Sequence, residues 1–501
     1  MGLFINTDAH TFFNTDRDDW DARGVEADID FYTARGGVEA MLFNMNFQRC
    51  YWRSHSRDAI WDGLEERGGK VYFHGDEIPE IPRVTRNARA LSERCPEFFG
   101  LRYRLCHERG VEMWHSVRMN DAHGTTEPRA NPQLSDLWRT RPDLLRCDYR
   151  RPFTGCWQSH TLDYGKSEVR EYNLALIREY LEHECDGVEL DWMRTLPIFA
   201  PGMEEPMRPV LTGFMRDVRA ACDEAAARFG HPVRLAHRVP LTPDETFRSG
   251  LDVFLWAAEG LADVVIPAPA YATSNALQAQ TELWRRLLPA SARLVPCLEW
   301  DVKSRVDVNP YTSLSQQADA ATDAGFASSF YHAGADGIYL YNHFRNNGGF
   351  QDQESMRDAF SWLGDPAKVA ARPRRHLATF HDSVSWCEGR WTVQDLPEAA
   401  WERSVVAFPI DAGGATAGRR AVVVLGAARP IPEVDIRLNG VPCARLPEGA
   451  PLPTLPTHPD GAAYATFEPP AGVLHDGRNT IDILNLSDKG FVPYWGEIWL
   501  P

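Results

Sequence analysis

Residues 185–194 read Cys-Asp-Gly-Val-Glu-Leu-Asp-Trp-Met-Arg, a short apolar stretch that carries two carboxylates, Glu189 and Asp191. Successive side chains of a β-strand point to opposite faces, so acids at positions i and i+2 face the same side. Acidic side chains are seldom buried unless they are paired or functional. The stretch therefore predicts a strand with a polar site at its end. An ion pair with Arg194 is the structural alternative.

Similar apolar runs recur on both sides of this stretch between residues 1 and 345, most of them followed by a polar or aromatic tip and then by helix-like sequence. Helical periodicity is clear in 167–185, 210–229 and 277–288. Strand alternating with helix eight times is typical of the α/β class and of a (β/α)8 TIM barrel, whose working residues lie at the carboxyl ends of the strands. An open sheet is the alternative, but no Gly-rich nucleotide-binding motif follows the first strand. The predicted strands are Leu3–Thr7, Glu39–Asn44, Val111–Val117, Gly187–Trp192, Val233–Val239, Asp263–Pro267, Arg293–Glu299 and Gly337–Tyr341.

The sequence changes character after a last predicted helix at 355–363. Residues 364–375 are typical of a linker, and residues 376–501 hold short Val- and Ile-rich runs, such as 421–425 and 433–438, separated by Gly, Pro and Asn. This pattern predicts a small all-β sandwich of the jelly-roll kind. We therefore predict a barrel domain over residues 1–365 and an accessory sandwich over residues 376–501.

Composition limits the classes of function. The chain of 501 residues has 44% hydrophobic and 25% charged residues, as in soluble globular proteins, and contains no apolar run of 18 residues. Its net charge of −17 disfavours nucleic acid as a partner. The ten cysteines lack paired metal-ligand spacing, so reduced thiols and no metal or cofactor are expected. The opening residues Met1–Asn6 have neither a basic start nor an apolar leader, which favours a cytoplasmic protein. Homo-oligomerisation is left open.

Polar and aromatic side chains gather at the ends of the predicted strands. Two carboxylates, groups that bind hydroxyls and flat aromatic surfaces are what glycoside chemistry requires. The pattern predicts a glycoside hydrolase acting on an oligosaccharide or glycoside. Asp191 and Glu299, on strands four and seven, are predicted to flank the scissile bond, and Glu189 and Asp121 are further catalytic candidates. The candidate substrate-binding residues are His115, Arg118, Asn120, Trp192, Arg194, His237, Trp300, Tyr341 and His343.

Each of these candidates has a structural alternative. Arg118 suits a structural ion pair, the two buried-type histidines suit a core, and the tryptophans suit packing. Asp336 starts a strand at the wrong end of the barrel and is predicted to be structural. We expect Arg118 or Arg194 beside Asp191 to keep it ionised, with Glu299 as the acid. The reverse assignment stays open.

The runs 162–172 (Leu-Asp-Tyr-Gly-Lys-Ser-Glu-Val-Arg-Glu-Tyr) and 186–194 resemble the family-10-like glycosyl hydrolases. Those proteins have a (β/α)8 barrel, a DP…PEVR stretch before a helix, and a DGI-x-DY-x-R strand. The match covers roughly residues 100–200. By position, the resemblance implies that Asp191 and Arg194 are site residues.

Two other glycosidase patterns resemble parts of the chain. The chitinase-type motif D-G-x-D-x-D-x-E aligns with Asp186, Glu189, Asp191 and Met193, but Met193 stands where the proton-donating acid is required. Clan-A glycosidases place an acid on strand four and a Glu nucleophile on strand seven, where the run 297–300 resembles them. Their Asn-Glu pair on strand four is absent here, so the roles of the two acids are not assigned by this resemblance.

Two rival functions come from other classes. A metal-dependent amidohydrolase is suggested by His10 near strand one and His237 on strand five, although the usual H-x-H pair and an Asp ending strand eight are missing. A non-catalytic carbohydrate-binding protein is the second rival. Segments 434–440 and 476–481 resemble galactose-binding-like jelly rolls attached to glycosidases, which implies an accessory sandwich.

Overall fold

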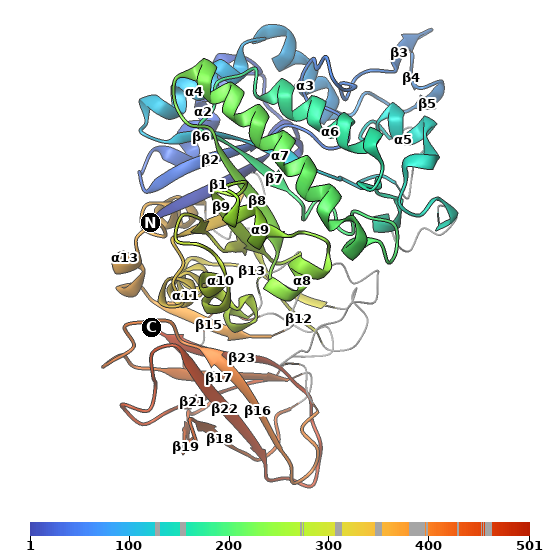
Figure 1. The fold of residues 1–501 in the computed structure, drawn as a ribbon. Helices are drawn as coiled ribbons and strands as arrows, with labels where there is room; N and C mark the ends of the chain where they lie inside the picture. Colours follow the sequence, from blue (N-terminus) through green and yellow to red (C-terminus); the bar gives the residue numbers. More distant parts are fainter. Residues whose placement is uncertain are drawn as a thin grey trace.

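The computed structural model describes residues 1–125, 131–150, 157–270, 273, 275–305, 313–345, 353–379, 396, 399–427, 430–451, 453, 455 and 463–501. It shows a TIM barrel in the upper part of the molecule and a C-terminal β-sandwich below it (Figure 1). Parallel strands with helices on their outer side follow the alternation of the sequence. The predicted fold class is confirmed.

Apart from the seventh, which is found in two pieces, the barrel strands in the described residues start and end within two residues of the predicted ones. Their order in the sheet is β10-β9-β8-β7-β6-β2-β1-β14-β11. The two end members, β10 and β11, are two pieces of the predicted seventh strand. The strands are β1 (Gly2–Asp8), β2 (Val38–Asn44), β6 (Glu112–Arg118), β7 (Gly187–Asp191), β8 (Arg234–Pro240), β9 (Val264–Ala268), β10 (Arg293–Leu294), β11 (Cys297–Glu299) and β14 (Gly337–Tyr341).

The seventh strand closes the barrel across the break between β10 and β11. Val295 N donates to Val265 O at 2.9 Å on the β9 side, and Tyr339 N donates to Pro296 O at 3.0 Å on the β14 side. Pro296 has no N–H to offer, which interrupts the ladder at this point. The eight-strand count of the sequence therefore gives a closed cylinder, whose carboxyl ends meet at one face.

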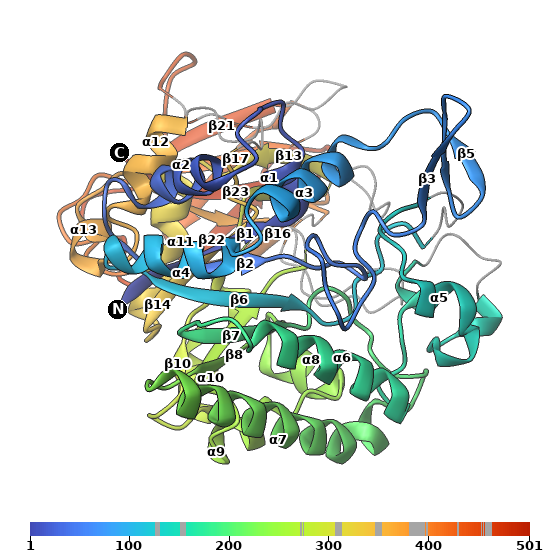
Figure 2. The ribbon, with the colours of Figure 1, turned by 90° about the horizontal axis from the view of Figure 1, so that it is seen from above.

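Helices cover the outside of the barrel, and α6 and α7 run side by side in both views (Figures 1 and 2). The predicted helix 210–229 starts earlier, at Glu204, and ends before Gly230, whose φ of 79° suits a left-handed helix cap. The predicted helix 277–288 divides into a 3-10 turn, Ala276–Ala279, and α10. The helices are α1 (Ala9–Phe13), α2 (Ala22–Thr33), α3 (Arg83–Arg94), α4 (Phe98–Glu108), α5 (Asp136–Thr140), α6 (Ser167–Tyr180), α7 (Glu204–Phe229), α8 (Pro243–Arg248), α9 (Val253–Ala258), α10 (Thr281–Leu287), α11 (Ala320–His332), α12 (Gln353–Phe360) and α13 (Pro366–Ala370).

Two insertions extend from the carboxyl ends of the strands. The small antiparallel sheet β3 (Leu64–Arg67), β4 (Lys70–Phe73) and β5 (Asp76–Ile78) stands away from the barrel (Figure 2). The fully buried Arg49 holds its base by donating to Leu134 O at 2.7 Å, Asp62 O at 2.6 Å and Asp136 Oδ1 at 2.6 Å. The hairpin β12 (Asp301–Arg305) and β13 (Ser313–Gln317) follows β11.

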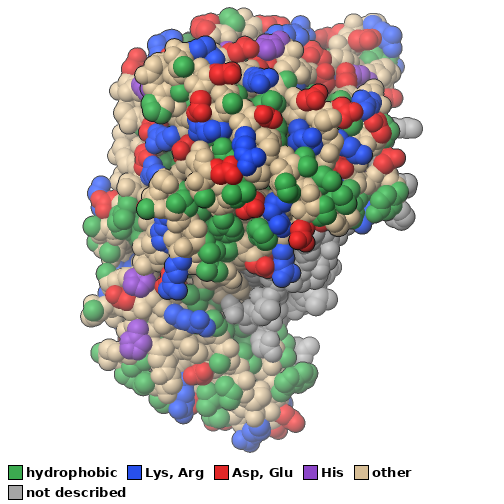
Figure 3. Space-filling model, viewed as in Figure 1, with side chains coloured by type: hydrophobic (Ala, Val, Ile, Leu, Met, Phe, Trp, Pro, Cys, Tyr) green, Lys and Arg blue, Asp and Glu red, His purple; other side chains and the backbone are tan. Residues whose placement is uncertain are grey.

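The outer surface mixes charges of both signs. Figure 3 shows basic and acidic side chains interspersed over the helices on the face seen in Figure 1. Within the described residues, none of the helices combines the length and the low polarity needed to cross a bilayer.

The C-terminal sandwich consists of two antiparallel sheets, ordered β15-β23-β17-β21-β20 and β16-β22-β18-β19. Its own core holds side chains from both sheets, among them Phe408, Val423 and Ile483. The alternating burial of β16 and β22 fits strands with one face on a core. Its strands are β15 (Arg374–Ala378), β16 (Val405–Asp411), β17 (Val422–Ala427), β18 (Val434–Leu438), β19 (Val441–Pro442), β20 (Ala444–Arg445), β21 (Ala463–Glu468), β22 (Arg478–Asn485) and β23 (Pro493–Leu500).

The stretch 364–375, expected to be a linker, is folded. It contains α13 and the first residues of β15, and β15 packs against α11 of the barrel. Arg375 is buried and joins the two parts, because it donates to Glu497 on β23 and to Asp319 at the start of α11, both at 2.8 Å. Leu377, Tyr494 and Trp495 also pack into the core cluster of the barrel. The division into units 1–365 and 376–501 stays a prediction.

The close approach of α11 and β15 gives a stability prediction. A Cβ on Gly325 would lie 1.9 Å from the backbone oxygen of Arg375, so Gly325→Ala must push the strand away. We expect it to lower the free energy of unfolding by about 3 kcal/mol. Gly213→Ala on α7 is the matched control, because a Cβ there meets nothing within 4 Å, and it should stabilise slightly through helix propensity. Urea unfolding followed by circular dichroism measures both variants. Equal stabilities would contradict the packing argument.

Candidate active site at the carboxyl ends of the barrel strands

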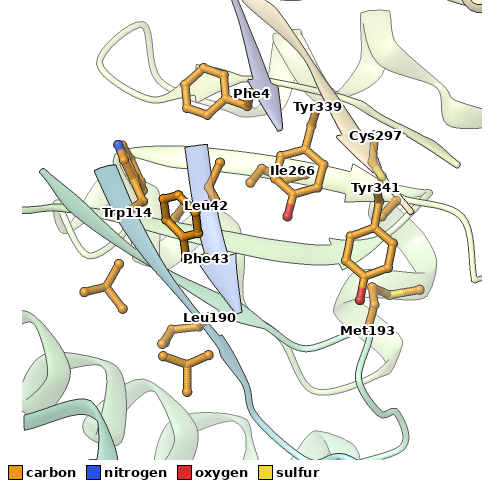
Figure 4. Close-up of a cluster of buried hydrophobic side chains, with 14 of the residues drawn as sticks. Phe4, Leu42, Phe43, Trp114, Leu190, Met193, Ile266, Cys297, Tyr339 and Tyr341 are labelled. Carbon is orange, nitrogen blue, oxygen red and sulfur yellow. The ribbon is translucent and has the colours of Figure 1, made fainter. Parts of the chain in front are cut away.

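Alternation along the strands selects which side chains enter the barrel. Ser116 and Arg118 of β6, and Tyr339 and Tyr341 of β14, contact side chains of other strands across the interior. Figure 4 shows both tyrosines projecting from the same side of β14, with Cys297 beside them. Glu189 accepts from Tyr339 on β14, and Asp191 accepts from Arg238 on β8, so both acids of β7 lie on that same inner face. The predicted common orientation of the two β7 acids is therefore found.

Arg238 on β8 joins the two carboxylates predicted as the catalytic pair. Its Nη1 donates to Asp191 Oδ1 at 3.0 Å, and its Nη2 donates to Glu299 Oε1 at 3.1 Å. All three side chains are 0–1% exposed. One guanidinium fork therefore spans β7 and β11, and its rigid geometry keeps the two bonded oxygens within about 8.4 Å of each other.

The surroundings of the two acids differ. Asp191 Oδ1 also accepts the backbone N–H of Met193 at 3.0 Å. Glu299 Oε2 accepts from Asn342 Nδ2 at 2.7 Å, and Arg194 Nη2 lies 3.9 Å from Glu299 Oε1. Burial raises the pKa of Glu299 above its ordinary value, although Arg238 and Arg194 oppose the shift. A buried carboxyl with a raised pKa is suited to hold a proton for donation.

Glu189 lies one layer below Asp191 and is completely buried. Its Oε1 accepts from the Tyr339 hydroxyl at 2.7 Å, and its Oε2 accepts from Asn6 Nδ2 at 3.3 Å. Burial, followed by the negative charge of Asp191, raises the pKa of Glu189 to about 7. Glu189 is thus set apart from the two acids that Arg238 bridges.

Asp121 belongs to a second ionic group beside the first. Arg118 Nη1 donates to Asp121 Oδ2 at 3.0 Å, and Arg118 Nη2 donates to Asp8. Burial alone would raise the pKa of Asp121, but His123, which contacts it at 2.9 Å, and Arg118 hold that pKa well below its usual range. Asp121 is therefore a fixed anion, and Arg118 is the partner of Asp8 and Asp121, whereas Arg238 donates to Asp191.

Tyr341 stands between the two ionic groups. The guanidinium carbons of Arg238 and Arg194 lie 3.7 and 4.8 Å from its ring centroid. Arg118 Nη2 lies 3.5 Å from its hydroxyl oxygen. Cations favour the negative face of an aromatic ring. Three arginines thus gather around one tyrosine, which was predicted to contact substrate.

Three predicted substrate-binding residues are placed in the helical layer instead of the barrel interior. His115 packs against the rings of Phe99 and Tyr180, and burial lowers its pKa to about 3. His237 Nε2 contacts Leu261 O at 2.8 Å, and its Nδ1 accepts from Trp192 Nε1 at 3.3 Å. These side chains alternate with inward-facing ones, so the structure does not bring them to the acids.

Three other predicted substrate-binding residues lie near the carboxyl ends, and two of them have structural partners. Asn120 exchanges two hydrogen bonds of 2.9 Å with the backbone of Leu162. Burial alone would lower the pKa of His343, but Asp323, 3.2 Å from its Nε2, raises it. Trp300 is half-buried in the turn between β11 and β12. Asp336, as predicted, is structural, because it binds Arg285 and Leu294 N at the amino end of β14.

Sequence reasoning missed several members of the cluster. Arg238 follows His237 in the same strand tip, and the alternation with His237 would have shown which of the two faces inward. Tyr339 is two residues before Tyr341 and shares its face. Asn342 has a φ of 63°, a left-handed conformation that Asn tolerates. The sequence around it contains no pattern that predicts this conformation.

The residues behind the metal-dependent alternative are not brought together. His10 stacks on Phe47 near the strand ends, whereas His237 lies in the helical layer. In the part of the chain that the structure describes, no group of three or more His, Cys, Asp or Glu is arranged to hold a metal ion.

Removing Arg238 should leave two buried carboxylates without their shared cation. We expect Arg238→Ala to lower the free energy of unfolding at pH 7 by about 3–5 kcal/mol, the usual cost of breaking a buried ion pair from one side. Arg216→Ala is the control, because Arg216 also donates two hydrogen bonds to carboxylate oxygens, both of Glu259, but on the exposed surface. Its effect on urea unfolding should be far smaller. Similar losses of unfolding free energy in both variants would contradict the expectation that a buried ion pair costs more to break than an exposed one.

Comparisons with known proteins give structural neighbours only. No family model matches the chain, and no curated protein matches it. Solved structures that match include a GH36 α-galactosidase of Geobacillus stearothermophilus in complex with stachyose, with 14% identity over 100% of this chain and a TM-score of 0.38. The chain spans 56% of that enzyme.

An α-amylase of Lactobacillus plantarum matches with 12% identity, 96% of this chain, 98% of the amylase and a TM-score of 0.39. A chitinase, ChiW, of Paenibacillus has 11% identity, 99% and 56% coverage, and a TM-score of 0.40. These neighbours are glycoside hydrolases, but likenesses at this level assign neither family nor activity, and the family-10-like resemblance stays a prediction.

Proposed function

We propose that the protein is a glycoside hydrolase that uses Asp191 and Glu299 as its two carboxyl groups. The observation that carries the proposal is the Arg238 fork, which holds both acids at the carboxyl ends of β7 and β11. Barrel enzymes work at that face of the fold. A pair of buried carboxyl groups in different surroundings is the arrangement that glycoside cleavage requires.

The surroundings assign a role to each acid. Glu299, whose pKa burial raises, protonates the oxygen of the leaving group. Asp191, which accepts from a guanidinium and a backbone N–H, is the anion that acts at the anomeric carbon. In a retaining reaction Asp191 would bond to that carbon, and Glu299 would then take a proton from the water that releases it. In an inverting reaction Asp191 would take the proton of the attacking water.

The span of the fork is compatible with either stereochemical course. Retaining enzymes hold their carboxyl groups about 5–5.5 Å apart and inverting enzymes about 6.5–9.5 Å apart. The limit of about 8.4 Å set by one guanidinium includes the retaining range and the lower part of the inverting range. The anomer released first, read by NMR, therefore separates the two courses.

The arginines around Tyr341 provide the hydrogen-bond donors with which the site would bind a sugar. The ring of Tyr341 already carries two guanidinium groups, so it positions Arg194 and Arg238 rather than offering a stacking surface. Guanidinium N–H groups are suited to bind sugar hydroxyls, or a carboxylate of an acidic sugar. Arg194 is the proposed substrate contact among them.

Substitution of either acid tests the proposal. We expect Asp191→Asn and Glu299→Gln each to lower kcat by at least about a hundredfold, the minimum usually lost with a positioned acid or base. The assay is a panel of aryl glycosides and polysaccharides, with products followed by NMR.

Matched controls are Asp336→Asn and Glu39→Gln. These carboxylates bind Arg285 and Arg293 at the amino ends of the strands, so they should keep turnover within about twofold. Near-normal turnover in the Asp191 or Glu299 variant would remove that residue from the mechanism. Sugar binding without turnover by the wild type would favour a carbohydrate-binding protein.

A further inference from the structure

We propose that Glu189 is a positioning residue for this site: it keeps its proton below neutral pH, so that Arg238 serves only Asp191 and Glu299, and its ionisation at higher pH weakens that bridge. The inference deepens the proposed function and rests on it for its catalytic meaning. It begins with the unequal distribution of cations among the three acids.

Arg238 is hydrogen-bonded to two of the three acids, Asp191 and Glu299. Its Nη1 and Nη2 point to Asp191 and Glu299 at 3.0 and 3.1 Å. Glu189 receives its hydrogen bonds from neutral donors, Tyr339 at 2.7 Å and Asn6 at 3.3 Å. A fully buried carboxylate without a bonded cation is costly, and such a group keeps its proton instead. The elevated pKa of Glu189, about 7, agrees with this distribution.

The groups facing Glu189 from the neighbouring strands are uncharged apart from one acid and one arginine. Hydrogen bonds from Ser116 and Tyr339 and the charge of Arg238 lower the pKa of Glu189, but burial and Asp191 outweigh them. β1 and β6 present the uncharged Asn6 and Ser116, which are hydrogen-bonded to each other at 3.0 Å. β14 presents Tyr339 and β11 presents the Cys297 thiol, and burial raises the pKa of both. The charged neighbours are Asp191 on β7 and Arg238 on β8, and Asp191 repels a second negative charge.

The side-chain amide of Asn6 can accept a hydrogen bond from the carboxyl proton of Glu189. Among the described residues, Asn6 Oδ1 is buried without a hydrogen-bond partner. Asn6 donates to Ser116 and Glu189 in the orientation described above; turned by 180°, the amide presents that oxygen to both groups and accepts the carboxyl proton instead of donating to Glu189. The amide then links two hydroxyl donors, which the opposite orientation does not allow.

Ionisation of Glu189 changes the balance at the bridge. A second negative charge would stand two residues below Asp191 on the same face of β7, and like charges disfavour each other strongly in a buried site. Arg238 would then be attracted by three acids instead of two. The two-point contact that holds Asp191 and Glu299 in place is expected to loosen as the pH rises above neutrality.

The first test measures stability against pH and needs no substrate. The pKa of Glu189 is raised in the folded state, so its contribution to stability is complete below its ordinary pKa of 4.5 and is lost as the pH rises to about 7. Relative to Glu189→Gln, the unfolding constant of the wild type should rise roughly a hundredfold between pH 4.5 and 7.5. Parallel curves for the two proteins would overturn the proposal.

Glu179→Gln is the matched control, because Glu179 is another buried glutamate with the opposite shift. Burial would raise its pKa, but hydrogen bonds from Ser56, Ser54 and Trp52 outweigh this effect and lower it. Its stabilisation is present above the ordinary pKa and lost on acidification. The two variants should therefore diverge from the wild type at opposite ends of the pH range.

The second test separates positioning from mere burial. A double-mutant cycle of Glu189→Gln with Asp191→Asn, read by urea unfolding, should give no coupling at pH 5.5 and an unfavourable coupling of at least about fivefold at pH 8.5. Equal coupling at both pH values would overturn the proposal. Once turnover is found, Glu189→Gln should move the alkaline limb of the pH profile of kcat upward relative to the wild type. An unchanged limb would also overturn it. Absence of any turnover would overturn the proposed function, while the two stability tests would still decide the state of Glu189.

Discussion

The rest of the site depends on the need to neutralise charge inside a closed barrel. Asp191, Glu299 and Arg238 are almost completely buried, and the guanidinium is the cation bonded to both acids. A buried ion pair costs desolvation free energy and rarely stabilises a fold on balance. Its retention at the carboxyl ends of three strands is therefore better explained by geometry, because the fork fixes two carboxyl groups from opposite parts of the barrel relative to each other.

The same constraint orders the neighbouring residues. Arg118 serves Asp8 and Asp121, and Tyr341 separates this group from the Arg238 bridge while its ring carries two guanidinium groups. The arrangement leaves the three acids closest to the bridge in unequal surroundings. Unequal carboxyl groups are what acid and base catalysis needs, because one group must hold a proton while another remains an anion.

The strands could be predicted from the sequence because apolar runs with polar ends recur in regular alternation with helices. Asp191, Glu299, Arg118 and Tyr341 could be placed for the same reason, since each ends a strand, and Arg194 closely follows the end of β7. His115, Trp192 and His237 were chosen by chemistry without regard to the strand period of two, which directs them outward. The partner of Asp191 was missed because ion pairing between β7 and β8 depends on a long-range register. The stretch 364–375 resembled a linker in composition, yet tertiary contacts with α11 order it.

The junction between the two parts of the molecule has a consequence for protein engineering. β15 lies against α11 so closely that the backbone of Arg375 occupies the space of a side chain at Gly325, and Tyr494 and Trp495 complete the core cluster of the barrel. Cutting the chain after Leu363 would uncover this face of α11 and expose apolar side chains that the C-terminal part now shields. The sandwich thus covers part of the outer surface of the barrel. Producing the barrel as an independent domain therefore requires a redesigned surface on α11.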